Sequence, residues 1–145
     1  MLLRRCWFNL NQTFRRRISH IGVTPDQFTV MRTLVEGNPK GLTQRELTEI
    51  MSSDPNTIAS LLERMETLEL LDRQPHEKDR RAKRIRLRPA GREKYEAARE
   101  IALTLQSEIL GVLPASRQKE FLSDLDRVGE ACSLAAEKPV LRSDP

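Results

Sequence analysis

The chain has 145 residues, of which 38% are hydrophobic and 32% charged, and this suits one globular domain or one domain with an added oligomerisation element. The net charge is +4, and the aromatic fraction of only 4% disfavours binding of single-stranded nucleic acid by base stacking. No run of about 18 apolar residues is present, so we expect no membrane-spanning helix.

The N-terminal residues 1–17 contain several arginines but neither the apolar segment nor the small-residue cleavage site of a signal peptide. Cys6 and Cys132 are too few for the disulfide framework of a secreted protein. We therefore expect a cytoplasmic protein that does not act at a membrane.

Residues 2–20 are predicted to form an amphipathic helix. Its apolar positions recur at 4-3-4-4 spacing and line one stripe, made of Leu3, Trp7, Leu10, Phe14 and Ile18 (or Arg17). A stripe that contains Trp and Phe needs a surface to pack against. That surface is either the rest of the chain or a second subunit, and the sequence leaves both open.

Two capping boxes predict the next two helices. The first, residues 24–27, has Pro25 at the first helical position, and the Gly-Asn-Pro of residues 37–39 ends that helix. The second box, residues 43–46, opens a short helix whose inward side chains are expected to be Leu47, Ile50 and Met51.

A third helix is expected to start at Asp54, which can cap it, with Pro55 at the first position. Its buried face is predicted to be Ile58, Leu61, Leu62, Met65 and Leu68. Two short helices joined by a tight turn are typical of a helix-turn-helix, although capped surface helices with polar first turns are also common. The outward residues predicted to contact DNA are Pro55, Asn56, Thr57, Ser60 and Arg64.

A basic β-hairpin is predicted next, with strands at residues 70–74 and 83–88. Residues 72–88 contain eight cations and three anions, a local balance of +5 against +4 for the whole chain. Ile85 and Leu87 alternate with arginines, so we expect the apolar side chains to face the domain and the arginines to face outward. A hairpin with this charge, placed after a helix-turn-helix, favours a wing that binds duplex DNA.

Two helices are expected to follow, at about residues 89–113 and 116–136. The first has inward positions at Tyr95, Ala98, Ile101 (or Ala102), Leu105, Ile109 and Val112, and the second has a seam at Phe121, Leu125, Val128, Cys132 and Ala135. Residues 138–145 have no pattern and are expected to be disordered. Because both ends of the chain carry apolar stripes, we predict a homodimer assembled through residues 1–22 and 90–137 around a winged helix-turn-helix at 23–89.

The chain resembles the MarR family of winged helix-turn-helix transcription regulators over residues 5–135. Residues 79–91 are similar to the family's wing signature, Asp-x-Arg followed by apolar-x-Leu-Thr-x-x-Gly, with support from residues 22–28, 42–47 and 54–58. The resemblance implies a mainly α fold with a small β-hairpin, flanked by N- and C-terminal dimerisation helices. It implies a dimer that binds palindromic double-stranded DNA. The second helix of the helix-turn-helix, the recognition helix, would lie in the major groove.

The resemblance also assigns roles to individual residues. Arg81 would enter or flank the minor groove and Asp79 would orient it by a charge-assisted hydrogen bond, while Thr43 and Gln44 would lie near the phosphate backbone. The wing residues predicted to contact DNA are Arg73, Lys78, Asp79, Arg80, Arg81, Lys83 and Arg84.

The chain departs from the family pattern at three positions. Arg88 replaces the usual Thr, and Glu69 and Ser52 replace glycines that normally end or connect helices. These departures keep a second function open, that of a winged-helix protein-interaction module without specific DNA binding.

Further family properties are expectations from the resemblance. A repressor released by a small-molecule effector is implied, with a pocket expected at Trp7, Asn11, Phe14, Phe28, Met31 and Tyr95. Cys6, which lies near arginines, is a candidate redox thiol, although a packed hydrophobic role is the alternative. The two histidines lie far apart in the sequence, and there is no Gly-rich phosphate loop. We therefore expect that the protein is not an enzyme and has no metal site and no cofactor.

Overall fold

The structure, a computed structural model, describes residues 1–137, so the tail predicted to be disordered lies outside the described residues. Residues Met1–Leu105 form one compact unit and a second begins at Gln106. The elements are α1 (Leu2–Ile18), the 3-10 helix η1 (Ser19–Ile21), α2 (Pro25–Glu36), β1 (Leu42–Thr43), α3 (Gln44–Ile50), α4 (Pro55–Thr67), β2 (Leu71–Pro75), β3 (Lys83–Leu87), α5 (Pro89–Leu110) and α6 (Ala115–Glu137). Within the described range, none of these helices combines the length and apolar content that a membrane span requires.

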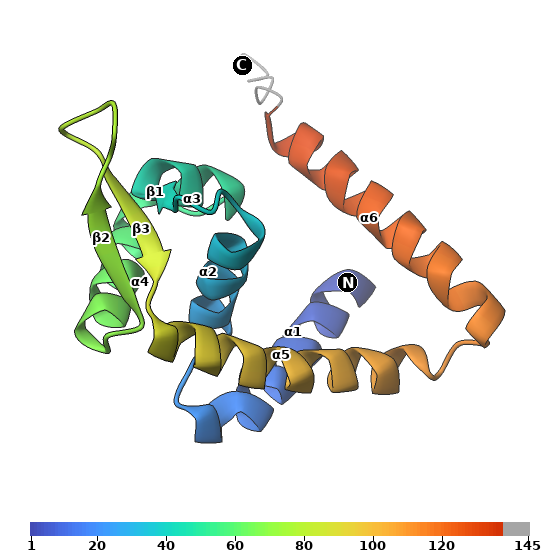
Figure 1. The fold of residues 1–145 in the computed structure, drawn as a ribbon. Helices are drawn as coiled ribbons and strands as arrows, with labels where there is room; N and C mark the ends of the chain where they lie inside the picture. Colours follow the sequence, from blue (N-terminus) through green and yellow to red (C-terminus); the bar gives the residue numbers. More distant parts are fainter. Residues whose placement is uncertain (138–145) are drawn as a thin grey trace, which may run out of the picture. The chain divides into compact units, whose positions relative to one another are not determined.

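The strands form a three-stranded antiparallel sheet in the order β1-β3-β2 (Figure 1). The predicted hairpin is confirmed, with Leu71 opposite Leu87 and Pro75 opposite Lys83. The sequence interpretation missed β1, in which Leu42 pairs with Ile85. A two-residue strand is too short to show an alternating pattern, and only its long-range partner reveals it.

The core of the first unit collects side chains from α1 to α5 and from the sheet. Figure 1 shows α4 beside the β2–β3 hairpin, with the hairpin tip at the end away from α5. Its largest fully buried side chains are Ile18, Val30, Met31, Leu47, Ile58, Leu62, Met65, Leu70, Leu71 and Ile85. This core fixes the helix-turn-helix and the hairpin to each other, because both contribute to it.

Local capping interactions set the starts of α2, α3 and α4 as the sequence predicts. Thr24 and Gln27 form a reciprocal capping box at α2, and Thr43 and Glu46 form another at α3. At α4, the Asp54 carboxylate accepts hydrogen bonds of 3.0 Å from the backbone N–H groups of the next two non-proline residues.

The predicted inward faces are wrong at helix ends. Ile50 is 59% exposed because it is the last residue of the short α3, and Leu68 is 55% exposed because it caps α4 where the chain turns away. Val112, expected on the long helix, is 84% exposed because α5 already ends at Leu110. At the last residue of a helix and beyond it, apolar spacing no longer predicts burial.

The two residues that stand where the family has glycine adopt the backbone conformation that glycine favours. Ser52 and Glu69 have φ values of 48° and 57°, in the left-handed region. After α4, the Glu69 N–H donates to the Glu66 carbonyl and the Leu70 N–H donates to the Met65 carbonyl, which is the Schellman arrangement. The helix exit is therefore unaltered. The Arg88 guanidinium lies 3.2 Å from the Glu69 carboxylate, so two of the three departures from the family pattern contact each other.

Gly91 allows α5 to begin directly against the end of the hairpin. A Cβ at this position would lie 2.0 Å from the carbonyl oxygen of Leu70 and 3.0 Å from its carbonyl carbon, and both are backbone atoms that cannot swing away. The close approach explains why the wing signature ends in glycine here.

We predict that Gly91→Ala lowers the free energy of unfolding by about 1–3 kcal/mol, because the added methyl overpacks a buried backbone contact. Urea denaturation followed by circular dichroism would measure the change. Gly129→Ala in α6 is the matched control: its Cβ meets nothing within 4 Å, so higher helix propensity should leave stability equal or slightly raised. Equal effects of the two substitutions would contradict the interpretation.

Candidate nucleic-acid interface

The predicted recognition residues of α4 all lie on its exposed face. The side chains of Asn56, Ser60 and Arg64 are solvent-exposed and make no hydrogen bond or ion pair within residues 1–137. Thr57 differs, because its hydroxyl donates a hydrogen bond to the Asp54 carboxylate. That hydrogen bond is the main reason why the pKa of Asp54 is lowered. The exposed face of α4, from its first turn to Arg64 in its last, therefore presents three free polar side chains and one that also supports the helix cap.

Thr43 and Gln44, predicted to lie near phosphates, sit at the start of α3. The Thr43 hydroxyl both donates to the Glu46 carboxylate and accepts from the Glu46 N–H. The hydrogen bond from the Thr43 backbone N–H is the leading cause of a lowered pKa for Glu46. The Gln44 side-chain oxygen accepts a 3.4 Å hydrogen bond from Arg73. Both residues are half-buried and already have protein partners.

The hairpin tip is an ordered turn held by side chain to backbone hydrogen bonds. His76 Nδ1 accepts from the N–H groups of Lys78 and Asp79, each at 3.1 Å. The Asp79 carboxylate accepts from the backbone N–H of Arg81 at 2.9 Å. We expected Asp79 to orient Arg81 by a charge-assisted hydrogen bond. The bond in the structure is to the Arg81 backbone N–H, so the carboxylate shapes the turn, and the guanidinium is unpaired within the described residues.

Four cations of the wing are exposed, and their charged groups make no hydrogen bond or ion pair in the described part of the chain: Lys78, Arg80, Arg81 and Lys83. They come from the tip and from the first residue of β3. We call this set the wing cations. It is the strongest concentration of unpaired positive charge that the described helix-turn-helix and hairpin present together.

The prediction that Arg84 faces outward is wrong. Its side chain is 11% exposed, donates to the Glu77 carboxylate at 2.8 and 3.0 Å, and donates to the Gly41 carbonyl at 3.0 Å. The alternation of β3 does place Arg84 away from the core, but the loop before the unpredicted β1 lies beside β3 and covers it. Arg84 is therefore a buried structural residue and not a free wing cation.

Arg73, also predicted to contact DNA, lies in the edge strand β2 and is bound to neighbouring helices. Its guanidinium lies 3.0 Å from the Glu66 carboxylate at the end of α4 and also reaches Gln44 in α3. Its side chain is 24% exposed. Arg73 thus joins the hairpin to both helices of the helix-turn-helix.

A hollow of about 640 Å³ lies between α3, the end of α4 and the wing. Predicted site residues from separate segments meet here, together with three that were not predicted as site residues: Arg45, Glu66 and Ala82. The signal for Arg45 was its place on the first turn of α3 next to Gln44. The lining consists of Thr43, Gln44, Arg45, Glu66, Arg73, Arg81, Ala82 and Lys83.

The predicted effector pocket is divided between packed and exposed residues. The rings of Phe14 and Phe28 meet edge to face at 5.1 Å, those of Phe28 and Tyr95 stack at 5.6 Å, and Met31 is fully buried. Trp7 is 64% exposed and Asn11 is half-buried. We call Phe14, Phe28 and Tyr95 the aromatic cluster. It joins α1, α2 and α5 within the first unit.

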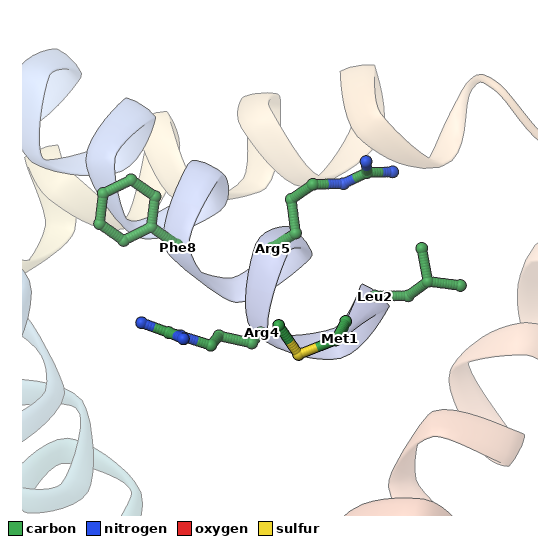
Figure 2. Close-up of a pocket in the computed structure, with 5 residues that line it drawn as sticks. All are labelled: Met1, Leu2, Arg4, Arg5 and Phe8. Carbon is green, nitrogen blue, oxygen red and sulfur yellow. The ribbon is translucent and has the colours of Figure 1, made fainter.

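A different hollow lies at the start of α1, lined by Met1, Leu2, Arg4, Arg5 and Phe8. Figure 2 shows Phe8 and Arg4 pointing to one side of the helix and Arg5 and Leu2 to the other. All five are exposed, so this is an open surface feature separate from the aromatic cluster.

The cysteines are both free and exposed, so the alternative in which they are packed hydrophobes does not hold within residues 1–137. The redox role of Cys6 stays a prediction. Across residues 1–137, no three His, Cys, Asp or Glu side chains come close enough to hold a metal ion.

Comparisons with known proteins agree with this geometry. Residues 21–82 match the sequence model of the MarR family. The DNA complex of Staphylococcus aureus MepR has a TM-score of 0.82 and 21% identity, covering 90% of this chain and 95% of that one. A MarR transcriptional regulator from Methanosarcina mazei Go1 has a TM-score of 0.83 and 19% identity, covering 92% of this chain and 95% of that one. The regulator MOSR from M. tuberculosis, in complex with DNA, has a TM-score of 0.70 and 25% identity, covering 90% of this chain and 95% of that one.

The three-stranded sheet, the capped α3–α4 pair and the solved likenesses define a winged helix-turn-helix protein. Residues 21–82, which span α2 to β2, match the MarR family model, so this part of the chain resembles that family. A comparison with curated protein sequences found no match.

The Glu77–Arg84 ion pair gives a testable pH dependence. Hydrogen bonds from the Arg84 guanidinium lower the pKa of Glu77 from 4.5 to about 2. Because the folded-state pKa is depressed, the pair stabilises the fold fully above pH 4.5, and this contribution is lost as the pH falls toward 2. We expect wild type to resist urea better than Glu77→Gln at pH 6, with the difference vanishing near pH 2.

The matched control is Glu63→Gln in α4, whose exposed carboxylate has no partner within the described residues. Its urea midpoint relative to wild type should change little across the same pH range. A wild-type advantage over Glu77→Gln that stayed constant down to pH 2 would contradict the assignment.

Proposed function

We propose that the chain is a homodimeric transcription repressor that binds palindromic double-stranded DNA. The observation that carries the proposal is that one rigidly packed unit presents both the free polar face of α4 and the unpaired wing cations. The DNA complexes of MepR and MOSR, which share the fold, support this assignment.

The chemistry of α4 suits the major groove. The Asn56 amide can pair with adenine, Ser60 can donate or accept, and Arg64 can donate to guanine or phosphate. Thr57 shares its hydroxyl with Asp54, so its methyl group, against thymine, is the contact we assign to it.

The wing suits the neighbouring minor groove and backbone. Arg81 carries an unpaired guanidinium next to a turn that Asp79 holds in place, which is the arrangement needed to enter a narrow groove of high negative potential. Lys78, Arg80 and Lys83 are exposed point charges for phosphates. Thr43 and Gln44 would approach the backbone at the hollow beside the wing.

We predict that DNA affinity, measured by fluorescence anisotropy on a footprinted inverted repeat from around the coding region, falls steeply with salt. A dimer that neutralises on the order of 6–10 phosphates should give a log–log slope of roughly −5 to −9. Arg81→Ala should weaken binding and lower the slope magnitude by about 2, one contact for each protomer. Arg32→Ala in α2 removes the same charge away from the wing and should do neither. An affinity that did not change with salt would overturn the proposal.

The dimer is proposed from apolar stripes that remain exposed within residues 1–137. Leu3 and Trp7 on α1 are 60% and 64% exposed, and the stripe on α6 is also exposed, with Leu125 at 43% and Val128 at 44%. Contiguous exposed apolar stripes mark interaction surfaces. A two-fold dimer would present its two α4 helices to half-sites about 34–36 Å apart, one helical turn of DNA.

We predict that Val128→Glu on the α6 stripe shifts the protein toward monomer in sedimentation velocity at micromolar concentration, because a charge would have to be buried between subunits. Ser123→Glu introduces the same charge on the opposite side of α6 and should leave the dimer intact. A wild-type protein that sediments as a monomer would contradict the dimer.

Release by a small apolar effector is the remaining part of the proposal. The aromatic cluster joins α1 and α5 to α2, so a ligand inserted among its rings would move those helices relative to the DNA-binding elements. The interaction-module alternative loses its motivation, because Ser52 and Glu69 keep the backbone of the glycines they replace. We also propose a cytoplasmic location for this repressor.

A further inference from the structure

The base of the wing is closed by one bidentate ion pair. Glu77 follows β2, and Arg84 lies in β3 on the other side of the tip. Arg84 Nε donates to Oε2 of Glu77 at 2.8 Å and an Arg84 terminal N–H donates to Oε1 at 3.0 Å. Parallel charge-assisted hydrogen bonds of this kind fix the relative orientation of the two side chains as well as their separation.

The same arginine connects the wing to the loop that precedes the helix-turn-helix. A second terminal N–H of Arg84 donates to the Gly41 carbonyl at 3.0 Å, and Arg86 Nε donates to the Lys40 carbonyl at 2.7 Å. Lys40 Nζ lies 3.8 Å from the Glu77 carboxylate. Two strand arginines and one carboxylate therefore hold the wing against residues 40–41.

The loop cannot move away from β3 without losing a close backbone contact. Gly41 is buried at φ 95°, and a Cβ there would lie 2.5 Å from the carbonyl oxygen of Ile85. Because the loop is fixed, the hydrogen bond to its carbonyl fixes Arg84, and Arg84 in turn fixes Glu77. A two-stranded hairpin is marginal by itself, so this attachment decides where the tip points.

We call Glu77, Arg84 and the Gly41 carbonyl the clamp. The clamp also neutralises a negative charge on the surface proposed to face DNA. The Glu77 carboxylate is 40% exposed and only one residue from Lys78, so by itself it would repel phosphates and weaken the field of the wing cations. Paired with Arg84, the carboxylate is neutralised, while the wing cations keep no acidic partner within the described residues.

We propose that Glu77, acting through Arg84, is a positioning residue that holds the wing cations at the angle required for DNA. The inference rests on the proposed function, because it concerns how the wing meets the duplex. Glu77 contacts no DNA in this scheme, and neither does Arg84.

The decisive variant is Glu77→Gln, for which charge and geometry predict opposite results. Removing a negative charge from the wing should tighten DNA binding if only the electrostatic field matters. Loss of the charged pair should instead weaken binding by roughly threefold to tenfold if Glu77 positions the wing. Glu63→Gln is the matched control: it removes the same charge from a carboxylate without a partner, and its affinity should stay equal or rise.

Arg84→Lys separates positioning from direct contact. Lysine keeps the positive charge and could still bind a phosphate, but it cannot form the bidentate pair or also reach the Gly41 carbonyl. We expect Arg84→Lys to weaken DNA binding as much as Glu77→Gln. Unchanged affinity in Arg84→Lys would show a direct contact and overturn the proposal.

Amide hydrogen exchange of the DNA-free protein tests the clamp independently of DNA. The tip amides of residues 76–82 should lose more protection in Glu77→Gln than the core amides do, because loss of the pair frees the tip locally in addition to lowering the global stability. Unchanged tip exchange, or a Glu77→Gln variant that binds DNA as well as wild type, would overturn the inference. If wild type itself bound no duplex, the proposed function would fail, and the role assigned to Glu77 in DNA binding would fail with it. Faster exchange of the tip amides in Glu77→Gln than in wild type would still establish the clamp.

Discussion

The pairing of β1 with β3 is the constraint on which the arrangement of this protein depends. Only two residues form β1, yet Leu42 lies opposite Ile85, both are buried, and the chain passes directly from β1 into α3. The strand therefore attaches the helix-turn-helix to the hairpin through the backbone, where rotamer changes cannot loosen it. Apart from the short turn that leads from α4 into β2, this pair is the backbone connection between the two DNA-facing elements within the described residues.

Ion pairs around the sheet reinforce that attachment from both sides. Arg73 binds the carboxylate of Glu66 at the end of α4, and Arg84 binds Glu77 and the loop before β1. Each is worth little as an isolated surface pair, but a network that shares rigid partners loses less side-chain entropy for each contact. Positive charge in the hairpin thus has two uses: part of it holds the wing in place, and the wing cations stay available to a ligand.

Contacts between residues close in the sequence could be predicted, and contacts between residues far apart in the sequence could not. The caps at Thr24, Thr43 and Asp54 involve residues two or three positions away, so they could be predicted and are confirmed. Arg84 was misplaced because its burial depends on a loop 43 positions earlier, and β1 was missed for the same reason. The candidate recognition residues of α4 are exposed as expected, whereas charge counting could not tell which hairpin arginines already had partners.

The contacts of Glu69 with Arg88 bear on whether the wing is a separable module. Each end of the hairpin is joined to a residue outside it: Arg73 to Glu66, and Arg88 to Glu69 at the left-handed turn after α4. A wing cut out at residues 72–88 and grafted onto another winged helix would carry half of each pair. The smallest portable unit runs from Glu66 to Arg88, and it needs a host whose loop offers carbonyls where residues 40 and 41 do.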